Sequence, residues 1–278
     1  MEPSLPPGLY IVATPIGNLS DLSPRAAETL RRADLILAED KRVTAKLLAH
    51  AGAKARMVTY HDYSSEEDRR RAIDAIATKA VALVSDAGTP LISDPGYKLV
   101  RAAREAGHLV TTVPGPCAAI AALTVSGLPT DRFLFLGFLP TKIKARRDAI
   151  DEIASVRASL IFYESGQRIG EMLAELSNCL GERDAAVVRE ISKLHEECVT
   201  GRLGELARLY AGRAPVKGEI VVVVGPPQEA ETVSDSDLDR MLEAALRRLS
   251  PSRAAAEVAE QLNIPRKRAY ARALELSR

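Results

Sequence analysis

The chain has 278 residues, of which 46% are hydrophobic and 27% are charged, the composition of an ordinary water-soluble globular protein. Its formal net charge of +1 excludes a strongly basic overall field, so any contact with nucleic acid has to come from local clusters of cations. The 3 cysteines lie far apart without a Cys-x-x-Cys pair and the 4 histidines show no ligand spacing, which argues against a disulfide scaffold and against a metal site.

Strand and helix signals alternate along the first part of the chain. Short apolar runs predict strands at 9–13, 35–38, 56–60, 81–85 and 109–113. Helical signals follow them at 24–33, 42–50, 64–79, 96–106 and 116–126. Ser23 and Pro24 supply a cap and a first-turn proline, and Ser64 and Glu67 have the spacing of a capping box. The alanine-rich helix at 116–126 is expected to be buried.

A second set of elements follows a hinge-like segment at 127–130. Strands are predicted at 133–138, 159–163, 185–189, 196–201 and 220–224, with helices at 145–156, 168–180 and 203–210. Fewer helices per strand favour a mixed sheet here, whereas regular alternation favours a mainly parallel sheet before the hinge.

After Gly225-Pro-Pro227 only helical patterning remains, at 234–249, 252–262 and 266–276, and the last two helices have the spacing of a helix-turn-helix unit. The predicted fold class is therefore α/β, with two αβα domains and a small helical tail. The expected domains are 1–128, 129–228 and 229–278.

Signals for export and for membrane insertion are missing. The amino terminus has neither the basic start nor the apolar core of a signal peptide. The longest uncharged stretch, 109–130, is interrupted by 3 prolines and 2 glycines, which break it into a strand, a turn and a helix. We therefore expect a cytoplasmic protein with reduced thiols and no membrane contact.

Three loops rich in glycine and proline follow predicted strands of the first sheet: 15–17, 87–92 and 113–118. Taken singly, each is compatible with ordinary turn chemistry. Because the carboxyl ends of parallel strands share one edge of a sheet, the three together predict a common ligand. None of the loops carries a basic side chain, which favours a neutral or zwitterionic ligand over a polyphosphate. The chain also lacks a Gly-x-Gly-x-x-Gly fingerprint, a P-loop and a Gly-x-Ser-x-Gly elbow.

Several longer motifs resemble those of one known family. They are Thr14-Pro-Ile-Gly-Asn-Leu19, Ala38-Glu-Asp40, the segment 85–96, Val113-Pro-Gly-Pro116, Ser126-Gly-Leu-Pro-Thr-Asp-Arg-Phe133, Phe162-Tyr-Glu-Ser165, Arg189-Glu190 and Lys193-Leu-His-Glu-Glu197. The chain resembles the tetrapyrrole-methylase superfamily over residues 9 to 225, and within it the branch that methylates small-subunit ribosomal RNA. It departs from the pattern at Lys41, where threonine is usual, at Gly166-Gln167 in place of Pro-His, and at Cys117, where serine is usual.

The resemblance implies S-adenosylmethionine as the cofactor, bound in a cleft between the two αβα domains. Matched position by position, it assigns cofactor contacts to Pro15, Gly17, Ala87, Gly88, Thr89, Ile92, Cys117, Ala118, Glu164 and Gly218. For Glu164, simple solvation at a strand end is the competing explanation. The implied reaction is 2'-O-methylation of a cytidine ribose in 16S ribosomal RNA, at the decoding centre of the small subunit. The implied assembly is a homodimer.

A base beside the ribose hydroxyl would assist such a transfer. Asp40 and Glu39 end the second predicted strand at the same edge as the loops, and Asp86 is the next candidate. The alternative for Asp40 is that it caps the following helix.

Binding to RNA requires cations near the cleft or in the tail. The candidates are Arg42, Arg147, Arg168 and Arg189 around the cleft, and Arg266, Lys267 and Arg268 in the tail. Residues 245–278 hold 8 Lys and Arg against 3 Asp and Glu, a local charge of +5 that favours RNA docking over a merely solvated helical face.

Two other functions remain open. The first is a tetrapyrrole or corrin methylase, although that subgroup usually has Gly-x-Gly-Pro-Gly-Asp where this chain has Ala13-Thr-Pro-Ile-Gly-Asn18. The second is a non-enzymatic regulator that binds nucleic acid through the tail, which would leave the three loops without a role.

Overall fold

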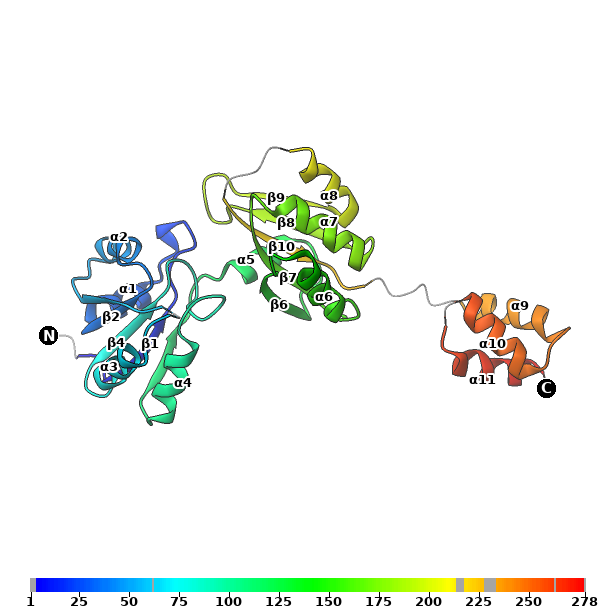
Figure 1. The fold of residues 1–278 in the computed structure, drawn as a ribbon, viewed down its shortest axis with the longest axis horizontal. Helices are drawn as coiled ribbons and strands as arrows, with labels where there is room; N and C mark the ends of the chain where they lie inside the picture. The colour runs from blue at the N-terminus through cyan, green and yellow to red at the C-terminus, as the bar shows by residue number, and fades with distance from the viewer. Residues whose placement is uncertain (1–3, 62, 214–217, 228–233, 263, 278) are drawn as a thin grey trace. The chain divides into compact units, whose positions relative to one another are not determined.

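The computed structural model describes residues 4–61, 63–213, 218–227, 234–262 and 264–277. The chain divides into two compact units, Met1–Pro227 and Gln228–Arg278. The first unit contains two β-sheets with their covering helices, and the second is helical (Figure 1). The fold class predicted from the sequence is confirmed.

The first sheet is parallel throughout and has the strand order β3-β2-β4-β1-β5. Its strands are β1 (Gly8–Val12), β2 (Leu35–Ala38), β3 (Arg56–Thr59), β4 (Ala80–Val84) and β5 (Val110–Val113). The central strand β4 is apolar and buried at every position, because helices cover both faces of the sheet. The edge strand β3 is mostly exposed.

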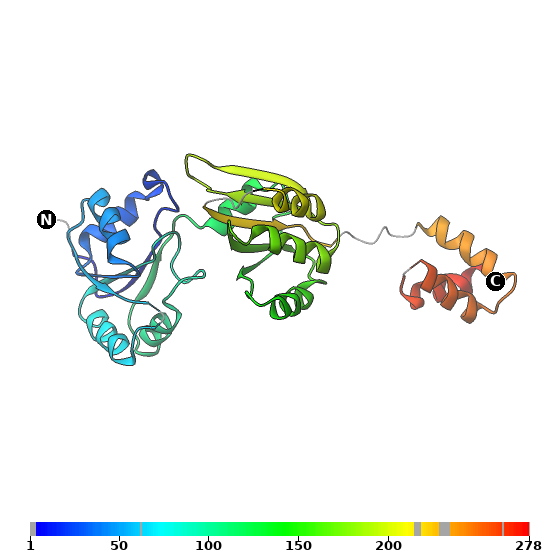
Figure 2. The same cartoon turned by 45° about the horizontal axis from the view of Figure 1, so that its top comes forward.

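Helices α1 (Pro24–Arg32) and α2 (Lys41–Ala51) cover one face of this sheet, and α3 (Glu66–Ile76) and α4 (Tyr97–Glu105) cover the other (Figures 1 and 2). A short 3-10 helix, Leu19–Asp21, precedes α1.

Side-chain caps fix the residues at which α1 and α3 begin, on the helices that cover the first sheet. Ser23 caps α1 as predicted, because its side chain accepts a hydrogen bond from the backbone N–H of Ala26 at 3.1 Å. The capping box of α3 lies one residue later than predicted and pairs Ser65 with Asp68. Asp68 is as good a reciprocal acceptor as Glu67, so the sequence pattern alone could not choose the register.

The second sheet is mixed and has the order β6-β7-β10-β8-β9, in which β6 and β7 are parallel and the other neighbours are antiparallel. Its strands are β6 (Phe133–Phe138), β7 (Ser159–Ser165), β8 (Asp184–Arg189), β9 (Glu197–Arg202) and β10 (Glu219–Val224).

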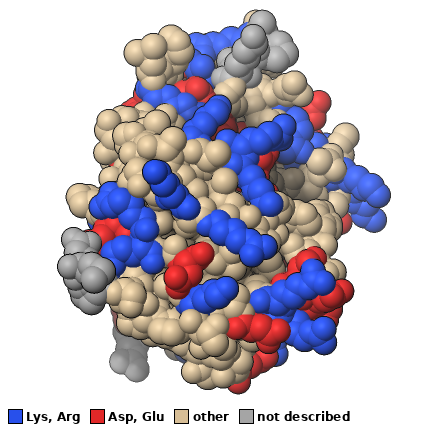
Figure 3. Space-filling view, turned by 90° about the vertical axis from the view of Figure 1, so that its left-hand side faces the viewer, with Lys and Arg blue, Asp and Glu red and all other residues tan. Residues whose placement is uncertain are grey.

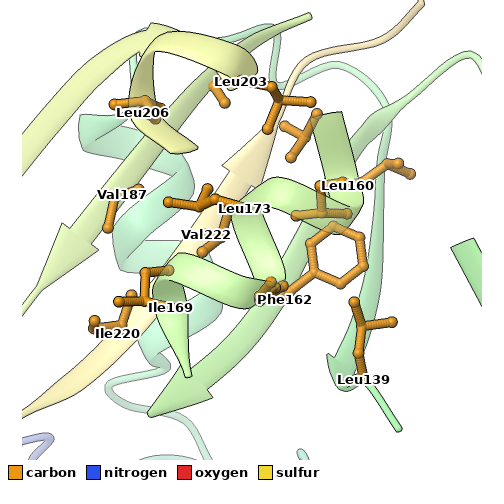
Figure 4. Packing of buried hydrophobic residues seen from close by; sticks show 14 of the residues in the cluster. Leu139, Leu160, Phe162, Ile169, Leu173, Val187, Leu203, Leu206, Ile220 and Val222 are labelled. Carbon is orange, nitrogen blue, oxygen red and sulfur yellow. The ribbon is translucent and has the colours of Figure 1, made fainter. Parts of the chain in front are cut away.

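Helices α6 (Ile143–Ile153), α7 (Ile169–Leu180) and α8 (Leu203–Ala211) pack on one face of this second sheet. Figure 4 shows their core, in which Phe162 and Val222 of the sheet meet Leu173 of α7. Helix α5 (Ala118–Val125) packs on the opposite face.

Helix α5 differs from the expectation of full burial. Ala119, Ala122 and Leu123 pack against the sheet, whereas Ile120 is 44% exposed and Val125 is 45% exposed. Apart from Thr124 the helix is apolar, but the sheet covers only one side of it.

The second unit consists of α9 (Asp235–Leu246), α10 (Pro251–Gln261) and α11 (Arg266–Leu276) around a small core of leucine, valine and alanine side chains. The turn between α10 and α11 gives the helix-turn-helix arrangement that their spacing predicts. None of the helices in the described part of the chain has the length and apolar character that a bilayer span needs.

Candidate active site

The three glycine- and proline-rich loops predicted from the sequence are joined by hydrogen bonds at one edge of the first sheet. Thr14 and Gly88 exchange backbone hydrogen bonds, at 2.8 Å and 3.1 Å, and so tie the loop after β1 to the loop after β4. Thr89 donates its hydroxyl to the carbonyl of Pro116 at 2.9 Å, which ties the loop after β4 to the loop after β5. The three loops therefore form one continuous surface.

This surface forms one side of a cavity of about 400 Å³, and the second sheet supplies the other side. Its wall is lined by Ile16, Glu39, Asp86, Ala87, Gly88, Thr89, Ile92, Ser93, Asp94, Cys117, Ala118, Phe138, Tyr163, Glu164, Ser165, Ile191, Gly218, Glu219, Ile220 and Val221. A cavity of this size is in the range of small-molecule and cofactor sites.

The loop after β4 has an unusual backbone. Gly88 has φ +80°, and a Cβ added there would lie 3.3 Å from a methyl group of Ile16. Leu91 and Ser93 also have positive φ, at 74° and 62°, a region that residues other than glycine rarely adopt. Such strain costs about 1–3 kcal/mol per residue and concentrates at ligand sites. The surrounding structure thus holds the loop in a backbone conformation that its residues do not prefer on their own.

The wall of the cavity is acidic. Five carboxylate side chains line it, and no Lys or Arg stands among its described residues. A wall of this kind favours a ligand that carries positive charge over an anionic one.

Asp40 and Asp86 occupy different environments, although both follow strands of the first sheet. Asp40 caps α2 by accepting from the backbone N–H of Arg42 at 2.7 Å, and the Arg42 guanidinium donates to the same carboxylate at 2.6 Å. The hydrogen bonds from Arg42 lower the pKa of Asp40 to about 2. Asp40 lies outside the described wall of the cavity. It caps α2, which is the alternative that the sequence offered to a role as catalytic base.

Asp86 lies in the wall, beside Glu39. Its Oδ1 accepts from the backbone N–H of Asp40 at 3.0 Å, and its own N–H donates to Glu39 at 3.4 Å. The residue retains contact with solvent, yet burial of its carboxylate against the cavity wall raises the pKa of Asp86, with the nearby charge of Asp40 acting in the same direction. A carboxylate with a raised pKa accepts a proton more readily than an ordinary aspartate.

Glu164 ends β7 inside the wall and is only 3% exposed. Its Oε1 accepts from the backbone N–H of Ser165 at 2.7 Å and from Nε of Arg168 at 2.8 Å. These bonds hold the carboxylate in one orientation. A solvated glutamate at the strand end, the alternative explanation for Glu164, is excluded because the residue is buried.

Tyr163 connects the wall to the start of α5. Its hydroxyl accepts from the backbone N–H of Ala119 at 3.1 Å, and its ring packs edge-on against Phe135 and Phe138. Burial raises the pKa of Tyr163, so the phenol stays protonated in the ordinary pH range. The first turn of α5 is therefore held at the cavity with its N-terminal end inward.

The loop between β8 and β9 closes over the first loop. A Cβ on Gly17 would lie 2.5 Å from the side-chain carbons of Lys193, so only glycine allows this approach. The hydroxyl of Ser192 donates to Asp21, and Lys193 pairs with Glu190 at 2.9 Å and with Glu219 at 3.0 Å. The contact of Ser192 with Asp21 and the approach of Lys193 to Gly17 join the two halves of the first unit next to the cavity, while the pairs with Glu190 and Glu219 hold Lys193 in place.

Comparisons with known proteins agree with this geometry. A family model described as tetrapyrrole (corrin/porphyrin) methylases matches residues 8–207, and one described as the RsmI C-terminal HTH domain matches residues 232–277. A protein of Erythrobacter litoralis named ribosomal RNA small subunit methyltransferase I is 56% identical over 98% of this chain and 96% of its own. The protein of the same name from Escherichia coli O157:H7 is 44% identical over 96% of this chain and 94% of its own.

The chain belongs to the ribosomal RNA small subunit methyltransferase I family of tetrapyrrole methylases. The resemblance read from its motifs is confirmed.

Solved structures related to this family share the fold of the first unit. A uroporphyrin-III C-methyltransferase from Thermus thermophilus, complexed with S-adenosyl homocysteine, matches with a TM-score of 0.54 and 25% identity over 78% of this chain and 97% of its own. A diphthine synthase matches with a TM-score of 0.61 at 18% identity, over 78% of this chain and 90% of its own.

Most of the positions that the family resemblance assigned to the cofactor lie in the wall. They are Ala87, Gly88, Thr89, Ile92, Cys117, Ala118, Glu164 and Gly218. Pro15 and Gly17 are absent from the described wall, and Ile16 between them lines it. Sequence reasoning did not single out Tyr163, Ser93 or Asp94, although all three stand inside motifs that carried the resemblance.

Most of the arginines predicted to bind RNA form salt bridges with Asp or Glu side chains. Arg42 pairs with Asp40, Arg147 with Glu175, Arg168 with Glu164, Arg189 with Glu197 and Arg268 with Asp235. Arg266 donates to Ser252 at 3.3 Å and lies with Lys267 and Tyr270 along a shallow groove of the tail. Arg278, counted in the tail charge, lies outside the described residues.

The tail is less basic as a folded unit than its last two helices are alone. Residues 234–277 contain 8 Lys and Arg against 7 Asp and Glu. Carboxylates of α9 pair with cations of α11, as Asp239 does with Arg272 at 2.6 Å. The local charge of +5 is thus mostly balanced within the unit. Within the described residues, no group of His, Cys, Asp and Glu is arranged to hold a metal ion.

Proposed function

We propose that this protein transfers the methyl group of S-adenosylmethionine to the 2'-oxygen of a cytidine ribose in 16S ribosomal RNA, in the decoding centre of the small subunit. The observation that carries the proposal is the acidic cavity at the joined glycine loops, in a chain whose relatives over nearly its full length are named for methylation of this RNA. The tetrapyrrole methylases among the solved structures are more distant in sequence, so a tetrapyrrole substrate is the weaker alternative.

The residues of the cavity fit this cofactor. S-adenosylmethionine carries a sulfonium and an ammonium group, and five Asp and Glu residues line the space without a Lys or Arg among the described wall residues. Two of the five, Glu164 and Glu219, pair with Arg168 and Lys193 outside the wall. Gly88 lets the loop after β4 pack closely against the loop after β1, because a Cβ there would lie 3.3 Å from Ile16 in the cavity wall. The N-terminal end of α5, at Cys117 and Ala118, suits the carboxylate of the amino-acid part.

When bound, the cofactor supplies an electrophilic methyl group on a sulfonium sulfur. The protein contributes alignment of that group with the ribose oxygen, worth up to about 7–11 kcal/mol in favourable cases. Asp86 is placed to take the proton from the 2'-hydroxyl, because it lies in the wall and its pKa is raised. Glu39 hydrogen bonds the backbone of Asp86 and supports its position.

Two further features belong to the proposal. The exposed apolar face of α5 supports a homodimer in which Ile120 and Val125 are covered, since α5 offers no charged residue to solvent. The groove of the tail with Arg266 and Lys267 supports a contribution of that unit to RNA binding. The proposed place of action is the cytoplasm, where small subunits are assembled.

The experiment that tests the function is mapping of ribose methylation on small subunits isolated from cells that lack the protein. Purified protein with S-adenosylmethionine should restore one missing 2'-O-methyl group on a 16S cytidine. Methylation at a base, or of a tetrapyrrole alone, would overturn the proposal. Size-exclusion chromatography with light scattering, comparing wild type with Ile120→Glu, tests the dimer separately.

A further inference from the structure

A basic surface lies next to the cavity and has no role in the reaction as proposed. It consists of α2, the turn that joins α2 to β3, the edge strand β3 and the loop after β3, and we refer to it as the α2–β3 surface. Its exposed polar and aromatic members are Lys41, Arg42, Lys46, His50, Lys54, Arg56, His61 and Tyr63.

The α2–β3 surface differs from α3, on the other face of the first sheet, in its charge. Residues 41–63 contain 5 Lys and Arg against 1 Asp and no Glu. On α3, by contrast, carboxylates neutralise the cations within one turn, as Glu66 does for Arg69 and Glu67 does for Arg71. Within the described residues, Lys41, Lys46, Lys54 and Arg56 form no ion pair, so their charges are available to a partner.

The surface begins at the wall of the cavity. Glu39, in the wall, follows β2, and α2 starts two residues later at Lys41. The backbone N–H of Asp40 donates to Asp86 at 3.0 Å, which fixes the start of α2 beside the proposed base. From there α2 runs back along the sheet for about 16 Å, at 1.5 Å per residue. A chain that leaves the cavity on this side therefore passes over successive cations.

An exposed aromatic side chain stands at the same edge. The backbone N–H of Tyr60 donates to Ala38 at 2.8 Å, so the loop after β3 starts next to the end of β2. Tyr63 in this loop is 94% exposed and has His61 edge-on at a centroid distance of 6.2 Å. Exposed aromatic rings interleaved with cations are typical of surfaces that bind single-stranded nucleic acid, because bases stack on them.

Figure 3 views the molecule from the side on which α2 lies in Figure 1. Lys and Arg side chains are spread over this face and outnumber Asp and Glu side chains. The charge of the protein as a whole is +1, so this concentration is compensated elsewhere.

We propose that the α2–β3 surface binds the phosphate backbone of the RNA strand that carries the target ribose, with Tyr63 stacking on an unpaired base. The proposal rests on the proposed function and names the surface on which its substrate docks. Cations placed about a helix turn apart can each neutralise one phosphate and release its counterions.

The test uses the full-length protein and compares two triple variants. One is Lys46→Gln/Lys54→Gln/Arg56→Gln on the surface. The control is Lys79→Gln/Lys98→Gln/Arg104→Gln, which removes the same charge from exposed cations elsewhere on the first sheet's helices and turns. Binding of small-subunit particles, and of a single-stranded RNA fragment, is measured across a salt series. Calorimetry with S-adenosyl homocysteine checks that both variants keep the cofactor site.

Each lost phosphate contact should flatten the slope of log affinity against log salt by roughly 0.7–0.9, hence by about 2 to 3 for the surface variant. Single-turnover methylation should show a raised KM with an unchanged maximal rate. Tyr63→Leu should weaken binding of single-stranded RNA about tenfold and leave the salt slope unchanged.

Slopes that are the same for the surface variant and its control would overturn the inference, provided that wild type methylates the RNA. Weaker binding with an unchanged slope would also overturn it, because contacts to a ribosomal protein rather than to phosphates would then be responsible. Failure of the wild-type protein to methylate any RNA would refute the proposed function itself.

Discussion

Arg168 and Glu164 interact through a single carboxylate oxygen. Nε of Arg168 lies 2.8 Å and Nη2 lies 2.6 Å from Oε1 of Glu164, and the backbone N–H of Ser165 donates to the same atom. The described residues provide no hydrogen bond to Oε2, although the Glu164 side chain is only 2% exposed and lines the cavity. Because Glu164 lines the cavity, Oε2 can accept a hydrogen bond from a ligand there, and a donor group of the bound cofactor is the expected partner.

The amino group of adenine is such a donor. We expect Glu164→Ala to weaken binding of S-adenosyl homocysteine by about 1.5–3 kcal/mol, or roughly 10- to 150-fold in Kd, because a hydrogen bond to a charged group is lost. Glu175→Ala removes another arginine-paired glutamate, that of α7, and should leave binding unchanged. The inosine analogue of the ligand, which lacks the amino group, should bind wild type weakly. Equal affinity of wild type for both ligands would disprove this contact.

Asp86 should matter for the chemical step more than Asp40. We expect Asp86→Asn to lower the single-turnover rate by roughly 10²–10⁴-fold, because a general base is lost. Asp40→Asn should keep its turnover, since asparagine caps a helix as well as aspartate does and Asp40 lies outside the described wall.

The rate of wild type should fall on the acid side at a higher pH than the ordinary aspartate pKa of 3.8, because Asp86 must be ionised and its pKa is raised. A normal rate in Asp86→Asn would shift the role to Glu39.

Asp40 should contribute to stability in a way that depends on pH. Its pKa is about 2 in the folded protein against an ordinary value of 3.8. A lowered folded-state pKa stabilises the protein above the unfolded-state value, and this stabilisation is lost as the pH falls through the folded-state value. The difference in free energy of unfolding between wild type and Asp40→Asn should therefore be constant above about pH 5 and shrink toward pH 2. A difference that does not change with pH would show that the Arg42 pair does not form in solution.

Gly88 and Gly107 offer a matched pair of substitutions. Both have positive φ, +80° and +75°, so valine strains the backbone similarly at each. A Cβ at Gly88 meets Ile16 in the cavity wall, whereas a Cβ at Gly107 meets nothing within 4 Å. We expect Gly88→Val to abolish binding of S-adenosyl homocysteine by calorimetry and Gly107→Val to lower only the melting temperature. Full binding by Gly88→Val would place the cofactor elsewhere.

Much of the fold followed from local signals in the sequence. Alternating apolar runs and helix caps predicted both sheets, because each strand and helix must bury its apolar residues whatever its neighbours are. Strand β9 at 197–202 and helix α11 at 266–276 lie where the pattern placed them. The exposed face of α5 was not predictable in this way, since an apolar helix gives no sign of which sides the sheet will cover.

The sequence by itself also determined that three glycine- and proline-rich loops follow parallel strands and therefore meet at one edge of a sheet. Only the tertiary structure decided which charged side chains of the chain form ion pairs with one another. Arg168 holds Glu164 from one turn away, but the partner of Arg268, Asp235, stands 33 residues earlier in the chain. Ion pairs form between groups that folding brings together, and their distance along the chain does not reveal them. For that reason the carboxylates of α9 balance the cations of the tail, while Lys41, Lys46 and Arg56 of α2 and β3 form no ion pair among the described residues.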